Sequence, residues 1–152
     1  MQLEYLCEIK LAYQDYWMVQ PYDGGEGSAF GTGEGTVTGE RIRGTIRWVN
    51  HPHRRSDNTW LPDTHGVIQT DDSAVILFTM QGRTVFPPNS PRRSRPSYSG
   101  RGRQLLTLMF EAEDERYAWL NTTLCVAEGA IVEGAMQARV YSCVNELVDE
   151  MV

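Results

Sequence analysis

Asp63 and His65 are the two side chains in this sequence whose types and spacing best suit acid–base chemistry. They stand two residues apart in a segment with the alternating pattern of a β-strand, so both should project from one face of that strand. A neighbouring carboxylate raises the pKa of an imidazole and selects its tautomer, as a general acid or base requires. We therefore expect Asp63 and His65 to be catalytic; the alternative is a surface ion pair or a structural histidine.

A second group, Tyr117, Trp119 and Asn121, repeats the two-residue spacing. In a strand these side chains would share one face, where two aromatic rings beside an amide can line an apolar cavity with a polar anchor. Phe78, on the apolar face of another expected strand, would add to the same lining. We expect all four residues to bind the substrate.

Arginines on two expected strands could hold an anionic part of a ligand. Arg41, Arg43 and Arg47 share one face of a strand, and Arg139 lies on the last strand beside Tyr141. A guanidinium binds a carboxylate or an enolate oxygen through paired hydrogen bonds. We expect Arg43 to be catalytic and Arg139 to bind the substrate; the alternative is that these arginines form a solvated outer face.

The segment His51-Pro52-His53, with Asp57 four residues further on, contains groups that bind zinc or iron. Two arginines follow at positions 54 and 55, and their positive charge opposes a cation. The sequence therefore predicts no metal site and no cofactor, which leaves acid–base and electrostatic chemistry. His53 is instead expected to reach a ligand from a loop at the mouth of the fold.

The spacing of apolar residues and turn signals predicts eight or nine short strands and no long helix. The strands are expected near residues 3–11, 14–22, 35–38, 41–49, 60–70, 74–80, 104–111, 117–127 and 136–144. Because a closed sheet leaves no exposed edge, the prediction is an all-β fold: a single antiparallel β-barrel of about eight strands, forming one domain over residues 1–152. Residues 23–35 and 81–103 are expected to be long loops, at least one of which covers the barrel mouth.

Charge and composition narrow the class of protein. The formal net charge of −6 argues against general nucleic-acid binding. No apolar run approaches the ~20 residues of a membrane-spanning helix, and the first residues lack the blocks of a signal peptide. We therefore expect a cytoplasmic protein that binds neither nucleic acid nor membrane. Its three cysteines, Cys7, Cys125 and Cys143, are expected to be buried free thiols.

The expected strand at residues 74–80 has apolar side chains on both faces. One face carries Ala74, Ile76, Phe78 and Met80, and the other carries Val75 and Leu77. A barrel needs only one dry face, so another subunit should cover the second. We expect a homo-oligomer, most simply a dimer.

Several of these segments resemble a known family when they are taken in order along the chain. The motifs are Gly39-x-Arg41-x-x-Gly44, Asp63 followed by a strand ending Thr70-Asp71-Asp72, Tyr117-x-Trp119-Leu120-Asn121 and Arg139-x-Tyr141. Together they are similar to the bacterial domain-of-unknown-function family 3237 over roughly residues 3–145. The resemblance implies a small antiparallel barrel like those of allene oxide cyclase and the lipocalins. It implies no activity, because most members of the family have none assigned.

Two functions fit these residues. The first is a cofactor-independent enzyme, such as a lyase or decarboxylase, an isomerase or a cyclase, that acts on a small hydrophobic organic acid or an aromatic natural-product intermediate inside the barrel. The second is a non-catalytic small-molecule binding protein of lipocalin type. A buried acid–base pair at Asp63 and His65 on the cavity side would favour the enzyme, because a carrier has little reason to keep ionisable groups in a dry pocket.

Overall fold

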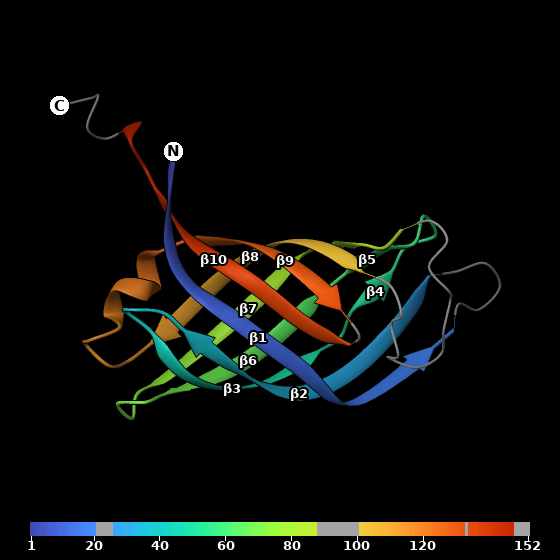
Figure 1. Ribbon diagram of the computed structural model, residues 1–152, viewed down its shortest axis with the longest axis horizontal. Coiled ribbons are helices and arrows are strands. Elements are labelled where there is room, and N and C mark those ends of the chain that lie inside the picture. The colour runs from blue at the N-terminus through green and yellow to red at the C-terminus, as the bar shows by residue number, and fades with distance from the viewer. Residues whose placement is uncertain (21–25, 88–100, 133, 148–152) are drawn as a thin grey trace.

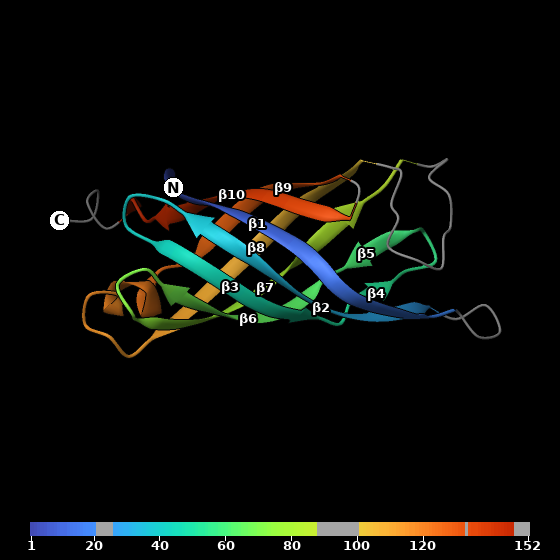
Figure 2. The same cartoon turned by 60° about the horizontal axis from the view of Figure 1, so that its bottom comes forward.

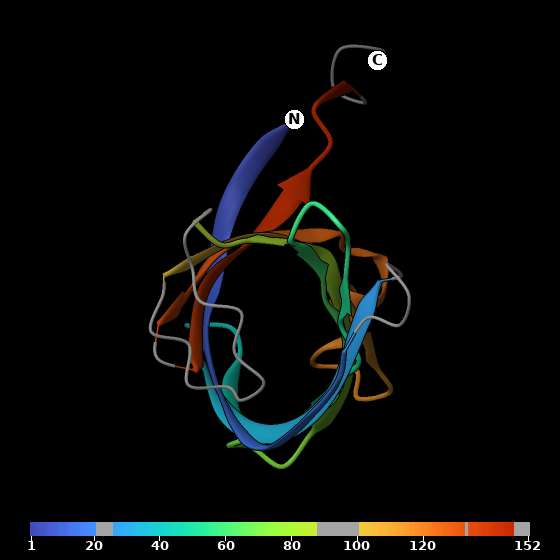
Figure 3. The ribbon, with the colours of Figure 1, turned by 90° about the vertical axis from the view of Figure 1, so that its right-hand side faces the viewer.

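The chain folds into an antiparallel barrel, seen here in a computed structural model that describes residues 1–20, 26–87, 101–132 and 134–147. Eight strands close into a ring in the order β1, β10, β9, β8, β7, β6, β3, β2 and back to β1 (Figures 1 and 3). Two short strands, β4 and β5, bridge β2 and β7 at one end of the ring. The predicted all-β barrel is therefore confirmed.

The ten strands and one short helix have the following bounds: β1 Gln2–Val19, β2 Gly27–Thr38, β3 Arg43–Asn50, β4 His53–Arg54, β5 Thr59–Leu61, β6 Asp63–Thr70, β7 Val75–Val85, β8 Gly102–Ala112, a 3₁₀ helix η1 Ala118–Thr122, β9 Cys125–Val132 and β10 Ala135–Val144. The two strands expected within residues 3–22 are one long strand, β1, which continues through register shifts near Tyr5 and Tyr13. Within the described residues, no helix is long and apolar enough to cross a lipid bilayer.

Alternation of side chains puts one face of each strand inside the barrel. In β3 the buried positions are Gly44, Ile46, Trp48 and Asn50, and the residues between them are exposed. In β7 the buried side chains Ile76, Phe78 and Met80 alternate with the more exposed Val75 and Leu77. The two-residue period therefore predicts correctly which side chains share a face in each strand. The apolar set of alternate side chains forms the continuous core of the barrel.

The glycine-rich segment is a strand, not the loop that we expected. Residues 27–35 belong to β2, which pairs with β1 and β3. A Cβ at Gly31 would overlap the Tyr13 ring, and one at Gly33 would overlap the Trp48 ring. Glycine is therefore required here for close packing and not for a flexible flap. Residues 23–25 lie outside the described part of the chain, as do residues 88–100 of the second expected loop, so coverage of the barrel mouth stays a prediction.

One end of the barrel is closed by η1, which lies beside the turn between β6 and β7 (Figure 2). Leu120 of η1 is 1% exposed and belongs to the main core. Asp72, in the turn, accepts hydrogen bonds from the Tyr117 hydroxyl at 2.9 Å and from Arg116 Nη1 at 2.8 Å. Asn121 donates to and accepts from the backbone of Ala112 in β8, at 2.8 Å each. We call Asp72, Arg116, Tyr117, Leu120 and Asn121 the end latch.

Arg116 of the end latch also forms a salt bridge with Asp114, and this pair should make the stability of the fold depend on acid. Hydrogen bonds from the Arg116 side chain hold the pKa of Asp114 at about 2, below its ordinary 3.8. A carboxyl whose pKa falls on folding stabilises the fold above its unfolded-state pKa, and that contribution disappears as the pH drops through about 2. Asp114→Asn should therefore lower the melting temperature at pH 7, and the difference from wild type should shrink below about pH 4 and vanish near pH 2. Thermal unfolding across this range measures it; a difference that persists unchanged at pH 2 would contradict it, and Glu115→Gln is the matched control.

Two of the three free cysteines are fully buried, as predicted, and Cys143 is half-buried. Burial raises the pKa of the Cys7 thiol to about 12 and that of Cys125 to about 11. Because the thiolate is the reactive form, these two thiols are poor nucleophiles and act as small core side chains.

The expected dimer stays a prediction, and the outer face of the barrel is where it should form. Val75 and Leu77 on β7 and Leu105 on β8 are each more than half exposed. Burial of such side chains by a second copy would be favourable. Light scattering at micromolar concentration should give twice the 17.2 kDa of one chain. A particle of one chain mass would contradict the prediction, and Leu105→Lys should dissociate the dimer.

Candidate functional site

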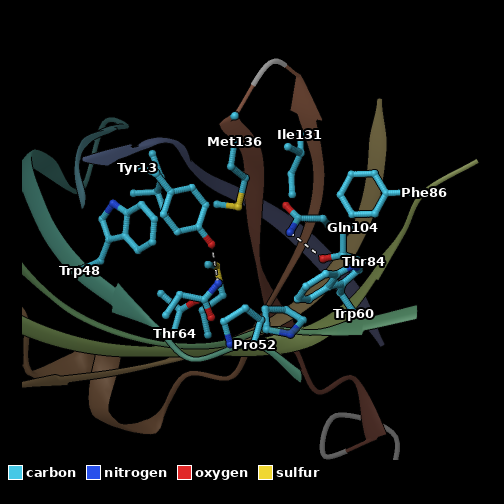
Figure 4. Close-up of a pocket in the computed structure, with 15 residues that line it drawn as sticks. Tyr13, Trp48, Pro52, Trp60, Thr64, Thr84, Phe86, Gln104, Ile131 and Met136 are labelled. Carbon is cyan, nitrogen blue, oxygen red and sulfur yellow. Dashed lines mark hydrogen bonds between the residues drawn. The ribbon is translucent and has the colours of Figure 1, made fainter. Parts of the chain in front are cut away.

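A cavity lies inside the barrel at the end opposite η1, where β4 and β5 bridge the ring (Figure 4). Its volume is about 50 Å³. The lining comes from inward-facing positions of several strands, and it consists of Leu11, Tyr13, Trp48, Asn50, Pro52, Trp60, Pro62, Thr64, Met80, Thr84, Phe86, Gln104, Ile131, Gly134 and Met136. Rings, methionines and prolines dominate this wall, as is usual for sites that bind small organic molecules.

Aromatic rings form two parts of the wall. Tyr13 and Trp48 meet edge to face with ring centroids 4.6 Å apart, a geometry that aromatic pairs prefer. The Trp48 indole N–H donates to the Glu34 carbonyl at 3.2 Å, which fixes the ring. Trp60 and Phe86 form a second small apolar cluster near the end of the barrel. A flat apolar ligand could therefore contact rings on either side of the cavity.

The first polar group in the wall is the pair Asn50 and Tyr13. Asn50 Nδ2 donates to the Tyr13 hydroxyl at 2.8 Å, and Asn50 Oδ1 accepts from the backbone N–H of Asp63 at 3.0 Å. Asn50 is only 7% exposed, and both sides of its amide have partners. The amide thus holds the tyrosine hydroxyl in a fixed position at the cavity.

The second polar group is Gln104 with Thr84, which are cross-strand neighbours in the β7–β8 ladder. Gln104 Nε2 donates to the Thr84 hydroxyl at 2.8 Å, as the dashed line in Figure 4 shows. Both side chains are buried. Gln104 Oε1 is buried without a hydrogen-bond partner.

The described part of the cavity wall has no charged side chains. None of the described residues that line the cavity carries a carboxylate, an ammonium, a guanidinium or an imidazole. A charged ligand would lose its hydration there without gaining an opposite charge. The cavity therefore suits an uncharged molecule.

Asp63 and His65 form the contact predicted from their spacing, but they do so on the outside of the barrel. His65 Nε2 lies 3.2 Å from Asp63 Oδ1, with side chains 56% and 41% exposed respectively. The buried residue between them is Thr64, which faces the cavity. A hydrogen bond from Gln81 is the main cause of the lowered pKa of Asp63. Asp63 and His65 therefore do not line the cavity, because the side chains that β6 turns inward are those of Thr64 and its alternate neighbours.

The cationic and imidazole residues assigned to the site also lie outside the barrel. Arg43 is exposed, and its backbone carbonyl accepts from Asp71 N–H at 3.0 Å. Arg139 is exposed, with Nη1 4.0 Å from Glu128 Oε1. His53 is exposed on β4. None of the three residues lines the cavity, and the exposure of both arginines agrees with the alternative of a solvated outer face.

The aromatic motif lies at the other end of the molecule. Tyr117 and Asn121 belong to the end latch, Trp119 packs on the core with Arg41 Cζ 3.5 Å above its ring, and η1 replaces the expected strand. Ala112, which Asn121 contacts, is eight positions along β8 from Gln104 at the cavity, about 26 Å along a strand. Phe78 is 3% exposed and fills the core, not the cavity. Substrate binding by these four residues is therefore not supported.

The histidine-rich segment places two exposed imidazole rings near each other. The rings of His51 and His53 lie 5.0 Å apart. Among the residues that the structure describes, no three histidine, cysteine, aspartate or glutamate side chains converge as metal ligands. The pair lies on the outer side of the bridge formed by β4 and β5.

Sequence reasoning missed the polar residues of the cavity, although a signal for them exists. Gln104 continues the inward phase of Leu106, Leu108 and Phe110 along β8. Thr84 and Asn50 likewise occupy buried positions in β7 and β3. A polar residue that stands in phase with a buried apolar stripe is a candidate for the cavity wall, because its side chain must point inward.

Comparison with known proteins agrees with the fold. A β-barrel-like protein from Acinetobacter baumannii AYE matches at TM-score 0.79 with 20% identity, over 93% of this chain and 94% of that one. A conserved protein of unknown function from Rhodopseudomonas palustris matches at 0.80 with 19% identity, over 94% and 97%. An enzyme from Penicillium herquei matches at 0.68 with 22% identity, over 92% and 93%.

At these identities the likeness concerns the fold alone. No curated protein matches the sequence. A family model does match, over residues 1–143, and that range includes the end latch and every residue of the cavity wall. The chain is therefore a member of DUF3237, a family of proteins of unknown function.

Proposed function

We propose that this protein binds a small, uncharged and largely apolar organic molecule in the cavity at the β4–β5 end. The observation that carries the proposal is the lining itself: aromatic and methionine side chains surround two fixed amides, and no described lining residue is charged. This is the composition by which proteins hold small ligands. An organic acid, considered from the sequence, would find no cation there because Arg43 and Arg139 lie outside.

Blocking the cavity tests the proposal. Met136→Trp should fill the space from β10, whereas Met109→Trp places the same ring on the outer face, where Met109 is 59% exposed. Thermal-shift screening of small neutral aromatics against wild type should identify ligands that raise the melting temperature, because a ligand bound only to the folded state stabilises it. Met136→Trp should lose this shift, and Met109→Trp and His65→Ala should keep it. Equal loss in Met109→Trp, or none in Met136→Trp, would refute the cavity as the site.

Catalysis in the same cavity is the second candidate, as a cofactor-independent lyase, isomerase or cyclase. Its support is the Tyr13 hydroxyl, held at the cavity by Asn50 at 2.8 Å, together with the Penicillium herquei enzyme of the same fold. A positioned phenol can act as a general acid. Tyr13 would then take the proton-transfer role that Asp63 and His65 cannot perform from the outer face.

Tyr13→Phe separates the two candidates. If the protein is an enzyme, the variant should bind its substrate with affinity near that of wild type and lose about 10²–10⁴-fold in turnover, the usual contribution of one proton-transfer group. Turnover equal to wild type would refute the role of Tyr13. Binding of ligands without any turnover would leave the non-catalytic binding protein as the function.

A further inference from the structure

The carbonyl oxygen of the Gln104 side chain is the feature of the cavity that most specifically calls for a ligand. Gln104 is 6% exposed, and its Oε1 is buried without a hydrogen-bond partner. In this arrangement Nε2 donates to the Thr84 hydroxyl, so the oxygen is the end of the amide that lacks a partner. A buried acceptor of this kind weakens the fold unless something donates to it.

The surroundings of Gln104 keep this oxygen available. Gly129, its cross-strand partner on β9, leaves the space beside it open; a Cβ there would lie 3.1 Å from Oε1. In Figure 4 the amide lies between Thr84, Ile131 and Phe86, with its oxygen on the side of Met136. Gln104 lines the cavity and Thr84 binds the nitrogen end of its amide, which leaves the oxygen as the end without a partner.

The rest of the wall defines the chemistry of the donor. An ammonium group would need a carboxylate, and none is present among the described lining residues. Trp60 and Phe86 lie near Gln104, and Tyr13 and Trp48 form another part of the wall. We propose, on the basis of the function proposed above, that Gln104 Oε1 accepts a hydrogen bond from the hydroxyl group of an uncharged aromatic ligand. The oxygen has no partner in the ligand-free protein, and the hydroxyl of the ligand supplies one.

Room for the ring comes from the methionines. The cavity of about 50 Å³ is smaller than the ~150 Å³ that holds a benzene molecule in an engineered protein. Met80 and Met136 both line it, and methionine adapts to new shapes through its three rotatable bonds. A ring therefore enters by shifting these side chains, while Thr84 keeps the Gln104 amide in place.

The test compares phenol with toluene, which has the same shape but no hydroxyl, on wild type and Gln104→Met. Affinities are measured by titration with detection by NMR. Wild type should bind phenol more tightly than Gln104→Met does by about tenfold, the upper range for one buried hydrogen bond. The affinity of toluene for Gln104→Met should equal or exceed its affinity for wild type, because the methionine side chain replaces the unsatisfied oxygen. Gln81→Met, the same change on the outer face, should alter neither affinity.

Each other outcome overturns the inference. If wild type and Gln104→Met bind phenol equally, Gln104 is not the anchor, although the proposed cavity stands. If wild type binds acetophenone, which can only accept, more tightly than phenol, the amide presents its nitrogen. If neither phenol nor toluene binds, the inference and the proposed function both fail. The double variant Thr84→Val with Gln104→Met replaces both partners by apolar groups and serves if the single variant does not fold.

Discussion

Replacing Leu120 with alanine should lower the free energy of unfolding by about 2–5 kcal/mol, although the residue lies far from the cavity. Leu120 is the buried side chain of η1 and belongs to the main core, so its removal leaves a hole under the end latch. Urea unfolding followed by tryptophan fluorescence measures the change. Ligand affinity at the cavity should stay within twofold of wild type, because about 26 Å of β8 separates the two ends.

Leu124→Ala is the matched control. Leu124 is 49% exposed just beyond η1, so its truncation should change the free energy of unfolding by no more than about 0.5 kcal/mol. Equal destabilisation by the two variants would show that η1 does not close the barrel. A large loss of ligand affinity in Leu120→Ala would place the functional site at the end latch instead.

Trp48→Ala should cost about 3–5 kcal/mol of stability and also enlarge the cavity. Trp48 is 6% exposed, packs against Tyr13, covers Gly33 and donates its indole N–H to Glu34. The space left by the side chain should accept indole. Added indole should therefore raise the melting temperature of Trp48→Ala well above its effect on wild type, as expected for a ligand that binds only the folded state.

Trp17→Ala provides the control for this experiment. Trp17 is 58% exposed on the outside of β1, and its loss should change stability little and give no indole response. If indole stabilises Trp48→Ala and wild type equally, the space inside the barrel at β3 is not where it binds. If Trp48→Ala is as stable as wild type, the aromatic wall is not packed as described.

The strand pattern of the sequence predicts the barrel because each strand buries one side. In β3 the two-residue period separates Arg43 and Arg47 from Ile46 and Trp48, and only the apolar set can fill a core. The same period does not determine which face points into the barrel when both faces of a strand carry polar residues. In β6, Asp63 and His65 lie in one phase and Thr64 and Ile68 in the other, and packing against Ile46 and Ile76 decides for the second.

The motifs that reveal the family turn out to maintain the fold. Asp72 joins Tyr117 and Arg116, Asn121 pairs with the backbone of Ala112, and Leu120 fills the end of the core. The contacts of Asp72 link residues over forty positions apart in sequence, so no local pattern could show them. A two-residue spacing of large side chains fits a strand, but here a 3₁₀ turn positions them.

The cavity could not be predicted from the sequence for a related reason. Its wall takes one or two residues from each of many strands, and these come together only when the ring closes. Gly31 and Gly33, which indicated a loop, make room for Tyr13 and Trp48 and so help to build the wall. The one sequence signal for the site is that Asn50, Thr84 and Gln104 stand at the same alternate positions as the buried apolar residues of their strands.

The most direct test of the central claim, that the interior cavity binds a small neutral molecule, uses the methyl groups of methionine. Met80 and Met136 line the cavity, whereas Met109 is 59% exposed on the outer face. In protein labelled with ¹³C at the methionine methyl groups, titration with phenol should shift the NMR signals of Met80 and Met136 and leave that of Met109 in place. Shifts at Met109 without shifts at Met80 and Met136, or no shift at any of the three at saturating phenol, would contradict the account.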